Sequence, residues 1–115
     1  MKLMPIVYVT DMDRSVAFYR AFCDSIRSQS PMWTEFCIGD ASLALHYSAS
    51  LPATSRLELS FVTAAPLEQV VSYLKGQGVA LEREITDEAF GRSIRVTDPD
   101  GLSIQVNEHD PELYG

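Results

Sequence analysis

Residues 42–46 read Ser-Leu-Ala-Leu-His, and residues 103–107, which lie 61 positions further along the chain, read Ser-Ile-Gln-Val-Asn. In both stretches, apolar side chains alternate with polar or small ones at the period of two that is typical of a half-buried β-strand. A similar order of expected elements precedes each stretch, so the repeat indicates two copies of one structural unit.

The first copy is expected to follow the order β-α-β-β-β. Residues 3–9 are rich in β-branched and aromatic types and predict a strand, after which Asp11 is placed as the N-cap of a helix. Strands are expected near residues 25–29, 33–38 and 42–47, with Gly39-Asp40 as a hairpin turn. The helix is predicted to bury the side chains that recur at helical spacing, which are Met12, Val16, Tyr19 and Cys23, with Phe18 and Phe22 widening this stripe.

The second copy repeats this order after a small, polar, proline-containing connector at residues 49–55. We expect a strand over residues 57–61 with Leu57, Leu59 and Phe61 facing the core, and then a helix with Pro66 in its first turn and Gly78 as its stop. Strands near residues 80–85, 92–97 and 102–108 follow, and Asp98-Pro99-Asp100-Gly101 predicts a type I turn. The chain is thus predicted to be a single α+β domain of residues 1–115, with module one at about 1–50 and module two at about 55–110.

The charge balance narrows the classes of partner. The formal net charge is −7 and the few basic residues are scattered, which argues against nucleic acid because phosphate binding needs clustered Lys and Arg. An acidic surface suits a cationic ligand, although solubility alone also explains it. No stretch approaches the roughly 20 apolar residues of a membrane span, and residues 3–9 lack the features of a signal peptide. We therefore expect a cytoplasmic protein in which Cys23 and Cys37 are reduced.

Several stretches resemble, in their order and spacing, the vicinal oxygen chelate superfamily of glyoxalases, bleomycin-resistance proteins, extradiol dioxygenases and fosfomycin-resistance enzymes. These stretches are Pro5 to Tyr19, Gly39-Asp40 with Leu43 to His46, Phe90-Gly91-Arg92, Asp98 to Gly101, and Ile104 to Val106. The resemblance spans essentially the whole chain. It implies paired modules whose mixed sheets curve into a partial barrel with the helices outside. It also implies a homodimer, because related chains build the full cavity from two subunits.

The resemblance further implies four metal-ligand positions, on the first and last strand of each module, which catalytic members fill with His, Glu or Gln. Strand alternation assigns these positions to Met4, Ala44, Glu58 and Gln105, although a one-residue shift would replace Glu58 by Leu57. One carboxylate and one amide do not make the usual set of three or four ligands, and a thioether binds such divalent metals poorly. We therefore expect no metal and no other cofactor, with one divalent ion held by His46, Glu58 and Gln105 as the alternative.

The predicted function is that of a small-molecule binding protein of the bleomycin-resistance type, since Trp33 to Phe36 running into Gly39-Asp40 also resembles those proteins. The alternative is a metal-dependent glyoxalase-type lyase or isomerase, or a dioxygenase-like enzyme, with Glu58 or His46 as the base. A third interpretation is an interaction module without a ligand of its own. The expected ligand contacts, which would stack through the aromatic rings and hydrogen-bond or pair charges through the other groups, are Tyr8, Trp33, His46, Glu58, Ser60, Gln105 and Asn107.

Structural roles compete with these functional ones. His46 is also explained as a hydrogen-bonded histidine and Glu58 as a solvated carboxylate. Trp33 and Tyr8 are also explained as core aromatics, because large rings are more often buried for packing than for binding.

Overall fold

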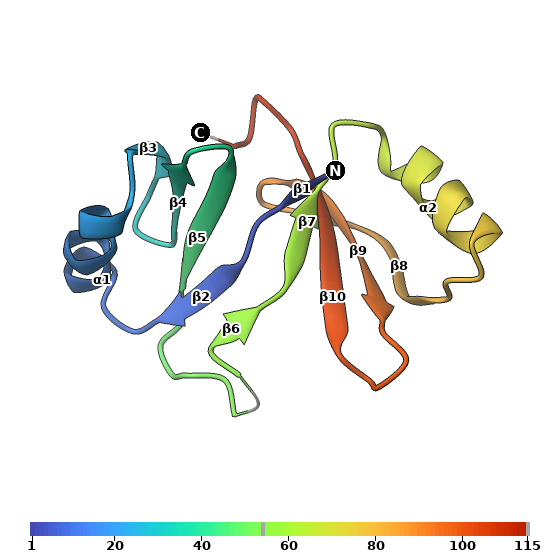
Figure 1. The fold of residues 1–115 in the computed structure, drawn as a ribbon, viewed down its shortest axis with the longest axis horizontal. Helices are drawn as coiled ribbons and strands as arrows, with labels where there is room; N and C mark the ends of the chain where they lie inside the picture. The colour runs from blue at the N-terminus through green and yellow to red at the C-terminus, as the bar shows by residue number, and fades with distance from the viewer. Residues whose placement is uncertain (54, 115) are drawn as a thin grey trace. The chain divides into compact units, whose positions relative to one another are not determined.

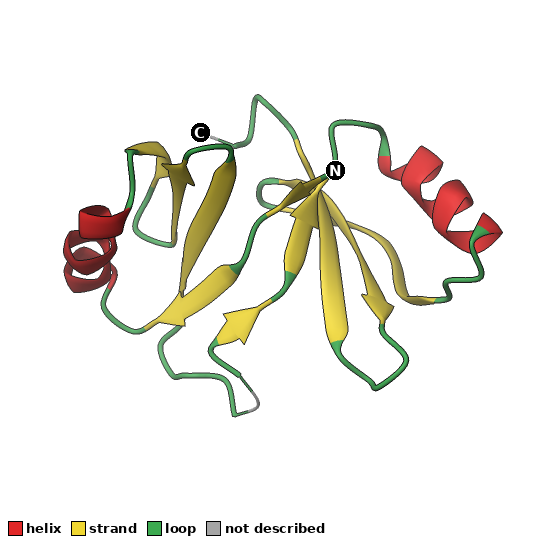
Figure 2. Cartoon of the chain, in the orientation of Figure 1, coloured by secondary structure: helices red, strands yellow, loops and turns green. Residues whose placement is uncertain are grey.

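The computed structural model describes residues 1–53 and 55–114. These residues form two compact units, the first spanning Leu3–Glu58 and the second combining Met1–Lys2 with the chain from Leu59 onward. Each unit contains a five-stranded mixed sheet that does not close into a barrel, and each carries one α-helix among its described residues (Figures 1 and 2). The predicted α+β class with two β-α-β-β-β modules is confirmed.

The first unit has the elements β2 (Ile6–Val9), α1 (Met12–Tyr19), β3 (Ser25–Gln29), β4 (Trp33–Ile38), β5 (Ala41–Tyr47) and β6 (Leu57–Glu58), with a short 3-10 helix, η1 (Arg20–Phe22), directly after α1. The strand order in its sheet is β3-β4-β5-β2-β6. Strand β2 runs parallel to β5, whereas its pairing with the short β6 is antiparallel.

The second unit has the elements β7 (Ser60–Val62), α2 (Leu67–Gly76), β8 (Leu81–Glu88), β9 (Gly91–Thr97) and β10 (Ser103–His109), and its sheet also contains β1 (Lys2–Leu3). The strand order is β1-β7-β10-β9-β8, with β7 parallel to β10. Strands β5 and β10, which contain the two repeated sequence stretches, therefore have corresponding neighbours in the two sheets. This correspondence supports the predicted duplication.

The two helices begin with different capping arrangements. The Asp11 side chain accepts a hydrogen bond of 3.1 Å from the Arg14 backbone N–H, so the predicted N-cap of α1 is confirmed. Pro66 precedes α2 as its N-cap residue rather than lying within the first turn. Because proline has no side-chain acceptor, the Glu108 carboxylate of β10 accepts the Leu67 backbone N–H instead, at 2.8 Å. A residue 41 positions away thus caps α2.

The predicted stop of α2 and the predicted turn are both present. Gly78 has φ +82°, and the Val79 N–H donates to the Leu74 carbonyl at 2.9 Å, which is the hydrogen-bonding pattern of a Schellman cap. In the loop between β9 and β10, the Gly101 N–H donates to the Asp98 carbonyl at 3.0 Å and closes the turn. Local residue chemistry therefore accounts for both chain reversals.

Each sheet packs one face against the helix of its own unit. The core of the first unit contains Val9, Met12, Val16, Phe36 and Leu45. The core of the second contains Leu67, Val70, Ile94 and Val106. We call the opposite face of each sheet, which points away from that helix, its distal face. No helix in the described parts of the chain has the length and apolar character needed to cross a bilayer.

Three apolar residues predicted to lie in the core are exposed instead. The exposed fractions of Phe18 and Phe22 are 60% and 66%. Helix α1 ends at Tyr19 and continues as the 3-10 helix η1, so the α-helical spacing that placed Phe22 in the buried stripe no longer applies there. Leu57 points to the same face as Val7, its partner on β2, but it is 59% exposed. It lies on β6, a strand of two residues at the edge of the sheet. Phe61, by contrast, packs against the core of the second unit as expected.

Candidate ligand-binding site

Three aromatic side chains form a row across the distal face of the first sheet. Trp33 on β4 and Tyr8 on β2 both lie opposite His46 on the strand between them, β5. The His46 ring centroid is 5.7 Å from that of Trp33 and 5.3 Å from that of Tyr8. These separations are within the range of interacting aromatic pairs. All three side chains are half-buried, so the row is partly accessible.

Glu58 joins this row at the edge of the sheet. It lies on β6 opposite Ile6, and its Oε2 accepts a hydrogen bond from the Tyr8 hydroxyl group. The Tyr8 backbone N–H also donates to the Arg56 carbonyl at 2.7 Å, which holds the segment before β6 against β2. Leu57 lies opposite Val7, whose side chain packs toward α1, so the alternative register with Leu57 on the distal face is wrong.

His46 is held in its neutral form near physiological pH. Burial lowers the pKa of the imidazole from its ordinary value of 6.5, and the negative charge of Glu58 opposes this shift without reversing it. A neutral imidazole offers a ring face and hydrogen-bonding nitrogens without adding positive charge. The resulting group, Tyr8, Trp33, His46 and Glu58, therefore combines aromatic surface with one carboxylate.

Sequence reasoning missed Glu35 as a site residue. This carboxylate is fully buried on β4 opposite Ala44, and it lies on the distal face because it follows Trp33 by two residues. The Ser42 hydroxyl donates to its Oε2 at 2.6 Å, and the half-exposed Arg27 side chain approaches it to 3.4 Å. The period of two from Trp33 would have indicated its orientation. No sequence signal indicated that a carboxylate would be fully buried there.

The other three predicted contacts lie together on the distal face of the second sheet. Gln105 on β10 pairs with Ser60 on the adjacent β7. The Asn107 Nδ2 donates to the Gln105 Oε1 at 3.1 Å. Ser60 and Asn107 are buried, whereas Gln105 is half-buried. The seven predicted contacts therefore divide into four residues in the first unit and three in the second.

The four positions implied for metal ligands do not make a suitable donor set. Met4 and Ala44 are fully buried and provide a thioether and a methyl group, neither of which binds divalent ions of oxygen chemistry well. Of the other two, Glu58 accepts the Tyr8 hydroxyl and Gln105 accepts the Asn107 amide. Within residues 1–53 and 55–114, no three His, Cys, Asp or Glu side chains gather as potential metal ligands. These residues do not fit the metal centre of the catalytic members.

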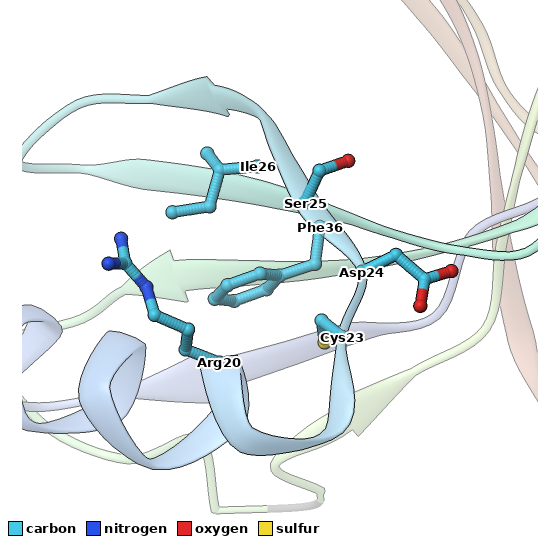
Figure 3. Close-up of a pocket in the computed structure, with 6 residues that line it drawn as sticks. All are labelled: Arg20, Cys23, Asp24, Ser25, Ile26 and Phe36. Carbon is cyan, nitrogen blue, oxygen red and sulfur yellow. The ribbon is translucent and has the colours of Figure 1, made fainter.

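A hollow of about 340 Å³ lies on the helix side of the first unit (Figure 3). Burial is the main cause that raises the pKa of the Cys23 thiol, with smaller contributions from Asp24 and Cys37. The thiol is therefore protonated at neutral pH, which makes it a poor nucleophile. None of the seven predicted contacts lines this hollow, whose residues are Arg20, Cys23, Asp24, Ser25, Ile26 and Phe36.

The sequence matches the family model described as the Glyoxalase/Bleomycin resistance protein/Dioxygenase superfamily over residues 3–106. No curated protein matches the chain by sequence.

Several solved structures are similar to the chain. One is described as an NAD-dependent benzaldehyde dehydrogenase from Legionella pneumophila, with a TM-score of 0.74, 18% identity, and coverage of 94% of this chain and 99% of that one. A glyoxalase/bleomycin resistance protein/dioxygenase superfamily member from Vibrio splendidus has a TM-score of 0.59, 14% identity, and coverage of 93% and 97%. A Methanosarcina mazei protein has a TM-score of 0.60, 18% identity, and coverage of 96% and 93%. At these identities the likeness shows the fold alone.

Proposed function

The chain belongs to the glyoxalase/bleomycin resistance protein/dioxygenase superfamily, and from this premise we propose that it is a metal-independent binding protein for a small organic cation. The proposed contacts in the first unit are Tyr8, Trp33, His46 and Glu58. The other three predicted contacts, Ser60, Gln105 and Asn107, lie in the second unit and are not assigned to the cation; they would offer hydrogen bonds to a ligand on their own sheet.

The observation that carries this proposal is the aromatic row with a carboxylate at its end. The faces of tryptophan and tyrosine rings attract a cation, by about 0.5–2 kcal/mol depending on how far the pair is shielded from water. Glu58 supplies the opposite charge, and its hydrogen bond from Tyr8 orients it beside the rings. The neutral His46 adds no repulsion, and the net charge of −7 favours the approach of a cation.

Metal independence follows from the poor donor set at the four implied positions. It is tested by adding Ni, Zn, Mn or Fe(II) to the purified protein, removing the excess, and measuring the metal content. Binding of one divalent ion per chain would contradict metal independence. It would instead favour the lyase or dioxygenase-like alternative, with Glu58 or His46 as the base.

Cation binding can be tested by fluorescence, because Trp33 is the single tryptophan of the chain. Benzamidinium, benzamide and benzoate have nearly the same shape but are respectively cationic, neutral and anionic. Benzamidinium is expected to change the Trp33 emission saturably at millimolar concentration, and benzoate is not. The same response to all three probes would contradict recognition of charge, and no saturable response to benzamidinium would contradict the proposed cation site.

We also propose that the protein is a cytoplasmic homodimer, as the family membership suggests. Light scattering during size-exclusion chromatography should then report twice the 12.8 kDa of one chain. A mass of a single chain at micromolar concentration would contradict the dimer.

A further inference from the structure

The side chain of Asn107 lies in the middle of the second sheet, on its distal face. Strand β10 runs between β7 and β9, and Asn107 is opposite Ser93 on β9 and Val62 on β7. The preceding residue, Val106, packs in the core against α2, so the Asn107 side chain points to the other face. Only 1% of Asn107 is exposed.

The hydrogen bonds of this amide are incomplete. Its Nδ2 donates to the Gln105 Oε1, which uses one of the two N–H groups. Its Oδ1 is buried and has no hydrogen-bond partner among the described residues. Leaving a buried carbonyl oxygen without a donor costs about 1–3 kcal/mol, so such groups are uncommon unless a water or a ligand completes them.

The neighbouring Ser93 already makes two hydrogen bonds of its own. Its hydroxyl group donates to the Glu88 Oε1 at 2.8 Å and accepts from the Arg83 guanidinium at 2.7 Å. Arg83 and Glu88 also approach each other to 3.8 Å. The charges of Arg83 and Glu88 are thus joined through Ser93.

Arg95, which lies opposite Gln105 on β9, donates to the Ser103 hydroxyl group. The Ser103 hydroxyl group in turn donates to the Glu82 carboxylate, so each cation near Asn107 is matched by a carboxylate.

The orientation of the amide does not change this conclusion. If Asn107 and Gln105 were both rotated by half a turn, Gln105 would donate to the Asn107 Oδ1 and the Asn107 Nδ2 would become the incomplete group. In either orientation, the Asn107 amide has both an oxygen that can accept and an N–H that can donate beyond its bond with Gln105.

From this hydrogen-bonding pattern, we infer that Asn107 is the centre of a second binding subsite, which recognises an uncharged group with an adjacent donor and acceptor, such as a primary amide. A carboxylate would place an acceptor against the Asn107 Oδ1, and an amidinium would place a donor against the Asn107 Nδ2–H. Each charged group therefore satisfies only one of the two polar atoms of the Asn107 amide. This subsite lies within the second unit, and the inference does not depend on the proposed cation site in the first.

The test uses the side-chain amide signals of Asn107 in a ¹H–¹⁵N NMR spectrum, titrated with the same three isosteric probes. Benzamide is expected to shift these signals saturably, whereas benzoate and benzamidinium are expected to bind at least tenfold more weakly at this position. Equal shifts from all three probes, or no saturable shift with benzamide, would overturn the inference. Because Trp33 emission reports the cation site separately, failure at one position is distinguishable from failure at the other.

Two variants separate recognition from structural support. Asn107→Asp keeps the size but removes the donor, and Asn107→Leu keeps a similar volume but removes both polar groups. Each variant should weaken benzamide binding by about tenfold, the loss expected for one or two hydrogen bonds. Binding is measured in these variants from the backbone amide signals of β10. Asn107→Leu should retain a dispersed spectrum and an unchanged or higher melting temperature, because it removes an unsatisfied buried carbonyl. Unchanged benzamide affinity in Asn107→Leu would overturn the inference, and so would a melting temperature that falls with the affinity.

Discussion

The Tyr8 hydroxyl group donates a hydrogen bond to the Glu58 carboxylate, although the two residues are 50 positions apart in the sequence. The contact is possible because β6 pairs with β2, which places Glu58 opposite Ile6 and diagonal to Tyr8 on the same face. This pair orients the carboxylate beside the aromatic row, so both its charge and its hydrogen bond can be tested separately.

Glu58→Gln should remove the charge while keeping an oxygen that accepts from Tyr8. We expect benzamidinium to bind at least tenfold more weakly to this variant, since the cation loses its opposite charge, as measured by titration of Trp33 emission. Tyr8→Phe is the matched variant for the hydrogen bond, because it keeps the ring and the Glu58 charge and removes only the hydroxyl group. It should lower the free energy of unfolding by about 1–3 kcal/mol. Equal benzamidinium affinity in Glu58→Gln and the parent protein would show that Glu58 is not part of the cation site.

His46 should make the stability of the protein depend on pH. Burial lowers the pKa of His46 in the folded state below its ordinary value of 6.5, so the unfolded chain binds more protons between these two pKa values. The free energy of unfolding should therefore fall as the pH drops below about 6.5, and level off below the folded-state pKa. His46→Gln should reduce this slope in urea denaturation measured at several pH values. A slope that is the same in the variant would assign the pH dependence to other groups.

Arg92 should stabilise the second unit only while its acidic partners are ionised. It contacts Glu68 at 2.6 Å and Glu108 at 2.9 Å, and its hydrogen bonds lower the pKa of Glu68 to about 2 and lower that of Glu108. Because these folded-state pKa values are depressed, the stabilisation is present above the ordinary pKa of 4.5 and is lost as the pH falls through the folded-state values.

Arg92→Met is therefore expected to lower the melting temperature at neutral pH and to have a smaller effect near pH 2, the pKa of Glu68. Arg95→Met removes a positive charge from the same strand, β9, without removing the ion pairs of Arg92, and so serves as the control for the loss of charge alone. A melting-temperature difference for Arg92→Met that is independent of pH would indicate that packing of its side chain, rather than the ion pairs, is responsible.

Gly91 should not tolerate a side chain. A Cβ atom at this position would lie 2.1 Å from the Glu108 carbonyl oxygen and 2.8 Å from the Asp110 backbone nitrogen, and the residue has φ +148°. Gly91→Ala should therefore lower the free energy of unfolding by about 2–4 kcal/mol. Gly76→Ala in α2 is the matched control, since a Cβ there meets nothing within 4 Å. It should be neutral or stabilising by up to about 1 kcal/mol in the same urea denaturation. Similar losses in the two variants would argue against the close contact as the cause.

Strand alternation predicted side-chain direction well where a strand is paired on both sides. Val7 and Val9 pack toward α1, whereas Tyr8 and His46 lie on the distal face, which is the face that alternation assigned to Met4 and Ala44. The same reasoning failed at Leu57, which is exposed. Its strand, β6, has two residues at the edge of the sheet, and a helix that covers the neighbouring strand does not cover it as well.

Helical spacing was reliable only over the length of the actual helix. Met12 and Val16 are buried as predicted, but the chain tightens into a 3-10 helix after Tyr19 and Phe22 is exposed. Glu35 and Asn107 show a further limit, because their burial and partners depend on residues of neighbouring strands.

The sequence by itself determined the two helices and the duplicated order of the modules. It did not determine that the strands predicted over residues 3–9 and 57–61 are each divided between the two sheets, as β1 and β2 and as β6 and β7. Hydrophobic periodicity, the Asp11 cap, the Gly78 stop and the Asp98–Gly101 turn all act between residues that are close in the chain. Only the tertiary structure decided that Tyr8 meets Glu58, that Glu35 is buried, and that the Asn107 carbonyl lacks a donor among the described residues. These relationships depend on strand register between distant segments. The register is set by the packing of whole sheets and not by the preferences of single residues.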